Sequence, residues 1–211
     1  MRYILALDLG RNHDPSAVAL LEIAEDGEPR RNWVTWALTQ PYRTTFRHLA
    51  RWPLGLDYPA QLDRLRRLVA SPSLSPHEIT LVVDATGVGT AVMDLLRKEG
   101  PRCRKVALTI TASGEPREVS GGYHVSRAEL LSSFLLGMQR RQFSIARATT
   151  GWRDFQEELT SLRARHSPTG AVRLEPVSGA HDDLVMAAAM AWWFNSRPRH
   201  PMFAAKPLLS Y

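Results

Sequence analysis

Residues 181–193 read HDDLVMAAAMAWW, which is the pattern of a buried helix that begins with two carboxylates. Alanine, leucine and methionine favour helix, and the apolar content predicts that little of this helix faces water. Neighbouring residues on a helix point about 100° apart, so Asp182 and Asp183 cannot both be solvated if the helix is buried. We therefore expect at least one of them to point into a cleft. The alternative is a charge pair at a frayed helix end, where the helix dipole favours anions.

Two further aspartates end apolar runs that are typical of buried strands. Asp8 follows YILAL at residues 3–7, Asp84 follows ITLVV at residues 79–83, and a glycine comes soon after each. A buried carboxylate is costly unless it is paired, hydrogen-bonded or bound to metal. One strand-end aspartate often caps a turn, but three separate cases indicate a shared site. Carboxylate oxygens suit Mg²⁺ or Mn²⁺ rather than zinc, and two such ions about 3.5–4 Å apart support phosphodiester cleavage.

The composition predicts one globular domain. The chain has 211 residues, of which 44% are apolar, and no window of 18 uninterrupted apolar residues indicates a membrane span. The start of the chain runs directly into a strand pattern and lacks the features of a signal peptide. Cys103 is the only cysteine, which excludes an intramolecular disulfide and a thiolate zinc cluster. A reducing cytoplasm is the expected location.

The charge of the chain favours a polyanionic partner. The net charge is +6, and 24 of the 27 basic residues are arginine, the side chain best suited to bidentate phosphate contacts. A basic surface around an acidic metal site is typical of a nuclease. An arginine excess can also reflect only a GC-rich genome.

The order of the expected elements predicts an α/β fold. Three consecutive strands form an antiparallel meander, and helical crossovers then lead to parallel strands, so the sheet is mixed and has helices on both faces. Asp8 and Asp84 lie side by side if their strands are neighbours. We expect one domain over 1–195 and an extended or disordered tail over 196–211. The expected strands are 3–9, 17–23, 33–39, 79–83, 105–110, 143–146 and 172–175, and the expected helices are 60–69, 90–99, 126–140, 152–165 and 181–195.

The chain resembles the nuclease domain of the large terminase subunit of tailed phages, which has a ribonuclease-H-like fold. The resemblance rests on Asp8-Leu9-Gly10 with Asp14-Pro15-Ser16-Ala17, on VDATGVG at 83–89, and on GAHDDLVMA at 179–187. It implies a metal-dependent endonuclease that cuts concatemeric viral DNA during genome packaging. It also implies two Mg²⁺ or Mn²⁺ ions with Asp8, Asp84 and Asp183 as primary ligands, Asp182 as an additional ligand, and His181 and Asp14 as outer members of the site.

The resemblance also implies partners. Large terminases usually carry an ATPase, but no Gly-x-x-x-x-Gly-Lys-Ser/Thr loop occurs here, and GVGT at 87–90 lacks the lysine. We therefore expect a separate packaging ATPase, a portal and a small terminase subunit, with double-stranded DNA as substrate, in the host cytoplasm if the chain is phage-encoded. Basic residues that are candidates for DNA contact, with a solvated basic face as the alternative, are Arg64, Arg66, Arg67, Arg140, Arg141 and Lys105.

Three other functions remain open at this point. A Holliday-junction resolvase shares the fold, but its closing helix tends to carry carboxylates three residues apart, and Met186 stands three residues after Asp183. A nucleotide-binding domain of the sugar-kinase and actin type fits Leu7-Asp8-Leu9-Gly10 but needs two domains and a far longer chain. A non-catalytic DNA-binding module on the same fold is the third alternative.

Overall fold

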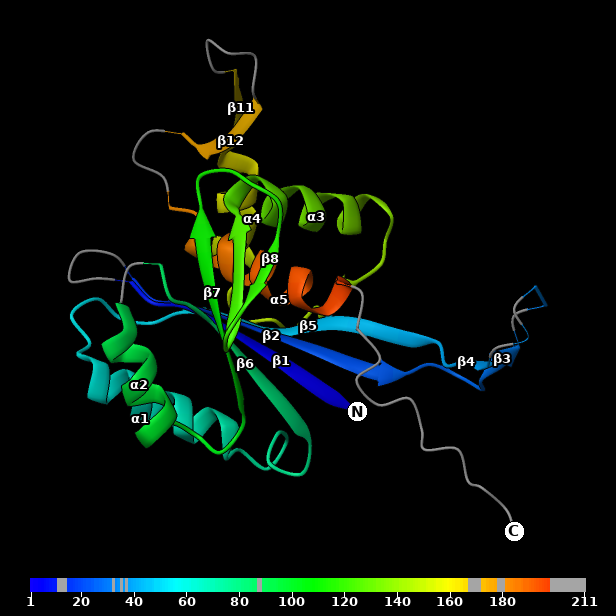
Figure 1. The fold of residues 1–211 in the computed structure, drawn as a ribbon, viewed down its shortest axis with the longest axis horizontal. Helices are drawn as coiled ribbons and strands as arrows, with labels where there is room; N and C mark the ends of the chain where they lie inside the picture. Colours follow the sequence, from blue (N-terminus) through cyan, green and yellow to red (C-terminus); the bar gives the residue numbers. More distant parts are fainter. Residues whose placement is uncertain are drawn as a thin grey trace.

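An eight-stranded mixed sheet with helices on both faces forms the body of the computed structural model (Figure 1). The structure describes residues 1–10, 15–31, 33–34, 36, 38–86, 89–166, 172–177 and 181–197. The strands are β1 Arg2–Asp8, β2 Ala17–Glu25, β3 Arg30–Arg31, β4 Leu38–Thr39, β5 Tyr42–Arg51, β6 Glu78–Asp84, β7 Arg104–Thr111, β8 Arg117–Val119, β9 Gly122–Ser126, β10 Ser144–Ile145, β11 Leu162–His166 and β12 Val172–Pro176. The helices are α1 Tyr58–Val69, α2 Gly89–Glu99, α3 Arg127–Gln139, α4 Trp152–Ser161 and α5 Asp183–Ser196.

The strand order confirms the predicted mixed sheet. The order is β10-β5-β2-β1-β6-β7-β9-β8. β2 is antiparallel to both β1 and β5, while β6, β7 and β9 continue from β1 as parallel strands. The carboxyl ends of β1 and β6 therefore meet at the same edge of the sheet. None of the helices that the structure describes has the length and apolar character needed to cross a membrane.

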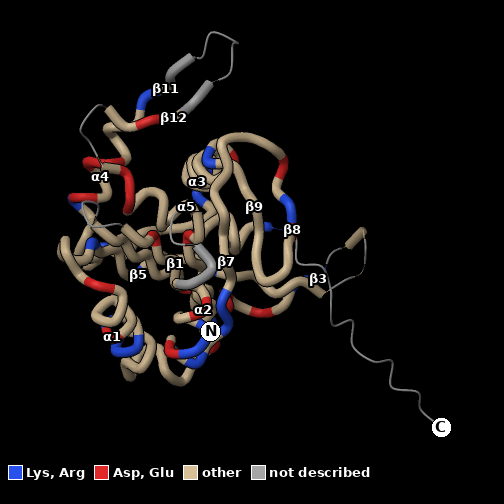
Figure 2. The backbone as a smooth tube through the Cα atoms, turned by 60° about the vertical axis from the view of Figure 1, so that its left-hand side comes forward, with Lys and Arg blue, Asp and Glu red and all other residues tan. Residues whose placement is uncertain are grey.

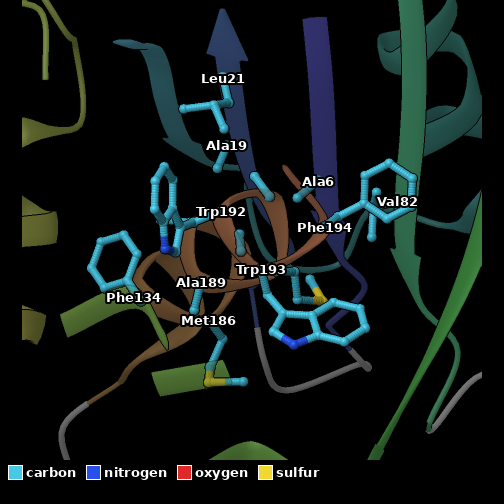
Figure 3. Packing of buried hydrophobic residues seen from close by; sticks show 14 of the residues in the cluster. Ala6, Ala19, Leu21, Val82, Phe134, Met186, Ala189, Trp192, Trp193 and Phe194 are labelled. Atoms are coloured by element: carbon cyan, nitrogen blue, oxygen red, sulfur yellow. The ribbon is translucent and has the colours of Figure 1, made fainter. Parts of the chain in front are cut away.

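The central helix α5 packs against the face of the sheet that α3 and α4 also cover. Its residues Leu184–Phe194 are all buried, because the helix is apolar on every side. Small side chains on β1 and β2, among them Ala6 and Ala19, allow it to approach the sheet closely (Figure 3). The opposite face is covered by α1 and α2, which pack on a second core that includes Leu5, Leu7 and Leu81.

The expected third strand over 33–39 is wrong. Of its described residues, Leu38 and Thr39 alone pair, as β4 with β3, and the side chains of Trp33 and Val34 are 79% and 89% exposed. This segment belongs to a hairpin that projects beyond the sheet (Figure 1). The third long strand is instead β5, over residues for which no strand was expected. Pro41 and Pro53 flank β5 without interrupting it, so the ladder with β2 is intact apart from one register shift.

Two other parts of the expectation also differ from the structure. The glycine-bearing stretch 113–122 contains β8 and leads into β9, because the turn between them allows an antiparallel pair. The helix expected over 152–165 ends at Ser161, and β11 follows and pairs with β12. The start of α3 is confirmed: Ser126 is the N-cap and accepts a hydrogen bond from the backbone of Glu129. The expected tail lies outside the described residues from 198 onward.

Gly137 permits the contact between α3 and α5. A Cβ atom at this position would lie 2.6 Å from Cε2 of Trp192, whose ring is held by a 3.0 Å hydrogen bond from Nε1 to the carbonyl of Ser133. We expect Gly137→Ala to lower the free energy of unfolding by about 1–3 kcal/mol through overpacking, although alanine favours helix. Urea denaturation measures this change. Ser132→Ala, on the exposed side of the same helix, is the matched control, and an unchanged midpoint for Gly137→Ala would contradict the prediction.

Candidate active site

Asp8 and Asp84 lie at the carboxyl ends of two neighbouring parallel strands. Asp8 is the last residue of β1 and Asp84 the last of β6, and the preceding pair, Leu7 and Val83, are in register. The apolar residues before each aspartate are buried in the sheet, which leaves the carboxylates at its edge. Oδ1 of Asp84 accepts a 2.8 Å hydrogen bond from the backbone of Thr86, which closes the turn after β6.

The start of α5 brings a third carboxylate to this edge. Asp183 is the first residue of the helix, and Asp8 interacts electrostatically with both Asp183 and Asp84. Burial, followed by the like charges of Asp84 and Asp183, raises the pKa of Asp8 to about 8, while the positive charge of Arg127 opposes the shift. We refer to Asp8, Asp84 and Asp183 as the acidic cluster. Its members come from three distant segments of the chain.

Asp182 and Asp183 have different partners, as expected for neighbours at a helix start. The carboxylate of Asp182, the N-cap residue, forms an ion pair with Arg127 at the start of α3. The carboxylate of Asp183 interacts with Asp8 and lies 3.5 Å from Nδ1 of His181. Asp183 is therefore the member of the pair that belongs to the acidic cluster, while Asp182 anchors an arginine beside it.

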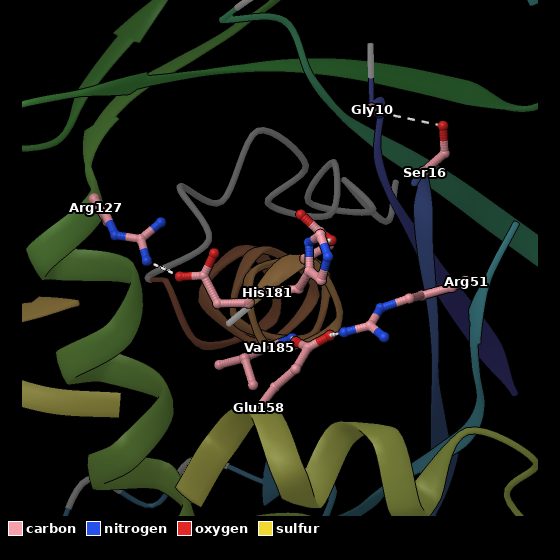
Figure 4. Close-up of polar contacts among 9 residues, drawn as sticks. Gly10, Ser16, Arg51, Arg127, Glu158, His181 and Val185 are labelled. Carbon is pink, nitrogen blue, oxygen red and sulfur yellow. Dashed lines mark hydrogen bonds and ion pairs between the residues drawn. The ribbon is translucent and has the colours of Figure 1, made fainter. Parts of the chain in front are cut away.

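Glu158 on α4 supports the first turn of α5. Its side chain is 3% exposed; Oε1 is paired with Arg51 at the end of β5, and Oε2 accepts a 2.9 Å hydrogen bond from the backbone of Val185 (Figure 4). The pKa of Glu158 is raised by burial, against the lowering effects of the Val185 N–H and of Arg51. The negative charge of Asp183 raises it further. This buried carboxylate ties α4 and β5 to the helix start that presents Asp183.

The predicted site did not include Glu158, Arg51 or Arg127. A signal for Glu158 exists in the helical spacing, because Phe155 and Leu159 place it on the apolar face of α4. A charged residue at such a position requires a buried partner. The partner of Glu158 is Arg51, which lies 107 positions earlier in the sequence. Local sequence patterns cannot identify a partner at that distance.

The basic residues predicted to contact DNA do not gather at the acidic cluster. Lys105 pairs with Leu81 inside the sheet, and its Nζ donates to the carbonyl of Pro101 before β7, at the end of the strand opposite to Asp84. Arg64 and Arg67 are exposed on α1, and Arg66 on the same helix pairs with Asp63 and donates to the end of α2. Arg140 and Arg141 follow α3, so they lie at the end of that helix away from the acidic cluster. Basic residues are spread over several elements, α1 among them (Figure 2). Asp14 lies outside the described residues.

The donor set of the acidic cluster fits a hard divalent cation. All of its donors are carboxylate oxygens, which suit Mg²⁺ and Mn²⁺. Within the ranges that the structure describes, however, no group of three or more His, Cys, Asp or Glu side chains is already arranged to hold a metal ion. The carboxylates are close enough to raise the pKa of Asp8 but are not preassembled as a coordination shell.

Comparison with protein-family models finds no match, and neither does comparison with curated protein sequences. Solved structures do match. The large terminase nuclease from thermophilic phage G20c with bound magnesium is 22% identical, with 90% of this chain and 80% of that chain covered and a TM-score of 0.59. The large terminase nuclease domain of Thermus phage P74-26 is 19% identical over 90% and 77% of the chains, with a TM-score of 0.52. That of bacteriophage SPP1 with bound manganese is 14% identical over 92% and 87%, with a TM-score of 0.52. The chain thus has the fold of large terminase nuclease domains.

Proposed function

We propose that the chain is a divalent-metal-dependent endonuclease that hydrolyses phosphodiester bonds of double-stranded DNA. The observation that carries the proposal is the meeting of Asp8, Asp84 and Asp183 at one edge of the sheet, since all three come from separate elements. The likeness to terminase nucleases solved with magnesium and manganese supports the same function. Two Mg²⁺ or Mn²⁺ ions are the proposed cofactors.

The three carboxylates of the acidic cluster would hold the ions. When bound, such ions lower the pKa of a water and offset the charge that develops on the leaving oxygen. The protein supplies the position of each ligand: the ends of β1 and β6 hold Asp8 and Asp84, and Glu158 holds the first turn of α5 behind Asp183. Because the pKa of Asp8 is raised to about 8, the metal competes with a proton for this carboxylate, and cleavage should increase as the pH rises toward 8.

The biological role that we propose is cleavage of concatemeric viral DNA during genome packaging. The likeness of the fold to large terminase nucleases supports this role. The proposed partners are a packaging ATPase, a portal and a small terminase subunit, and the proposed location is the host cytoplasm.

Incubation of the purified chain with supercoiled plasmid tests the enzymatic proposal. We expect nicked and linear products with Mn²⁺ or Mg²⁺ and none with EDTA, because the carboxylates alone cannot stabilise the leaving oxygen. The same ions should raise the melting temperature, since a bound cation relieves the repulsion within the acidic cluster. An intact plasmid with both metals, together with an unchanged melting temperature, would refute the proposed function.

A further inference from the structure

A pocket of about 270 Å³ opens beside the acidic cluster. Its walls come from the end of β7, the start of α3 and the strand β12. Ile110, Ala112 and Leu174 provide apolar surface, Arg127 provides a positive charge, and Glu175 provides a negative charge. The pocket thus combines one cation and one carboxylate with an apolar wall, so it can pair a phosphate with Arg127 while covering apolar parts of a nucleotide.

Two sets of contacts connect this pocket to the acidic cluster. On one side, the backbone N–H of Ile110 donates to Oγ1 of Thr86 at 2.6 Å, and the backbone of Thr86 in turn donates to Asp84. On the other side, Arg127 is paired with Asp182, next to Asp183 in the chain. The pocket is therefore built onto the same sheet edge as the carboxylates.

Arg127 is placed to bind a phosphate. Its side chain is 33% exposed, and its ion pair with Asp182 uses one terminal nitrogen, Nη2. A guanidinium has five N–H donors in a planar fork, so Arg127 can hold Asp182 and still donate to a phosphate oxygen. Its charge also offsets the nearby carboxylates, which otherwise repel a polyanion.

We propose that this pocket is a subsite for one nucleotide of the DNA strand next to the phosphodiester that is cut. Arg127 binds a backbone phosphate, and Ile110, Ala112 and Leu174 contact the sugar and base. Glu175 keeps the phosphate on the side of Arg127. The volume admits part of one strand and not a duplex. The apolar wall cannot form hydrogen bonds with base edges, so we expect the subsite to have low sequence preference. The inference rests on the proposed nuclease function and assigns the position of its substrate.

Binding of a fluorescein-labelled DNA duplex, measured by anisotropy with Ca²⁺ at several salt concentrations, tests the subsite. We expect Arg127→Gln to raise Kd about tenfold and to reduce the slope of log Kd against log salt by about 1, because one phosphate contact is lost. Arg127→Lys should retain the slope, because the charge remains. Ala112→Trp, which fills the pocket from an exposed position, should raise Kd and leave the slope unchanged.

Arg97→Gln is the matched control, because it removes one positive charge at the far end of α2 and should leave Kd unchanged. Melting temperatures of all variants identify any loss of fold. The subsite would be overturned if Arg127→Gln and Ala112→Trp both bound DNA with the Kd of the wild type. It would also be overturned if the wild type did not bind DNA. If the wild type binds DNA and Arg127→Gln weakens binding, yet no divalent ion supports cleavage, then the subsite stands and the nuclease function fails.

Discussion

Asp183→Asn should reduce Mn²⁺-dependent plasmid cleavage by about 10²–10³-fold or more, and Asp8→Asn and Asp84→Asn should do the same. Each asparagine keeps the shape of the side chain but removes the negative charge that we propose holds a cation. Because the three carboxylates share one site, loss of any one of them should disable it. The measurement is the rate of conversion of supercoiled plasmid to nicked and linear forms.

The matched control for this series is Asp94→Asn on the exposed side of α2, where the carboxylate is paired only with Arg97 in the described structure. It should cleave at the wild-type rate. Circular dichroism should show an intact fold for all four variants. Wild-type cleavage by Asp84→Asn would remove that residue from the site, and wild-type cleavage by all three variants would refute the acidic cluster as the catalytic centre.

Asp8→Asn should at the same time stabilise the metal-free protein. The pKa of Asp8 is about 8 in the folded state against 3.8 for an unperturbed aspartate. Between these two pH values the folded protein keeps the proton on Asp8, whereas the unfolded chain has lost it. Stability of the wild type therefore falls as the pH rises from about 4 to about 8, and asparagine removes this dependence. The gain in melting temperature in EDTA should be larger at pH 8 than at pH 5. An equal gain at both values would show that the carboxyl of Asp8 has an ordinary pKa.

Glu158→Ala should have the largest effect on stability, a loss of about 3 kcal/mol in the free energy of unfolding. The substitution leaves the guanidinium of Arg51 without its carboxylate and the N–H of Val185 without its acceptor, and it opens a gap in the core beside Phe155. Urea denaturation measures the loss. Glu157→Ala, at the exposed neighbouring position, should change stability by less than about 0.5 kcal/mol.

Glu158→Gln separates the positioning of α5 from folding. The amide oxygen can still accept from Val185, so most of the stability should remain, but the pair with Arg51 is weakened. We expect this variant to need a higher Mn²⁺ concentration for half-maximal cleavage, because Asp183 is held less firmly. If Glu158→Gln matches the wild type in both metal dependence and rate, then the buried pair serves stability alone.

Much of the fold could be predicted because its signals are local. Asp8 and Asp84 each end a short apolar run, and α5 is apolar on every side, so the strand ends and the helix start are marked in the sequence itself. The third strand was misplaced because exposed Trp33 and Trp36 have the composition of a strand without any core to face. The strand β5 was missed because Pro41 and Pro53 lie close to its two ends, although neither proline interrupts the strand itself.

The supporting residues of the site could not be predicted because their partners are distant. Nothing in the sequence distinguishes Arg127 and Arg51 from the other 22 arginines until the fold places them against Asp182 and Glu158. Long-range ion pairs depend on the packing of α3 and α4 around α5, and that packing is a property of the tertiary structure. The acidic residues themselves can be recognised from the sequence, whereas the residues that orient them cannot.

The helix α5 is both the centre of the larger core and the carrier of Asp183, and it comes after every other described element. A ribosome therefore releases β1 and β6, with Asp8 and Asp84, long before the residue that completes the acidic cluster. A nascent polypeptide cannot bury its largest apolar surface or assemble the proposed centre until α5 has emerged. Synthesis order thus delays assembly of the proposed centre until all the other described elements have been made.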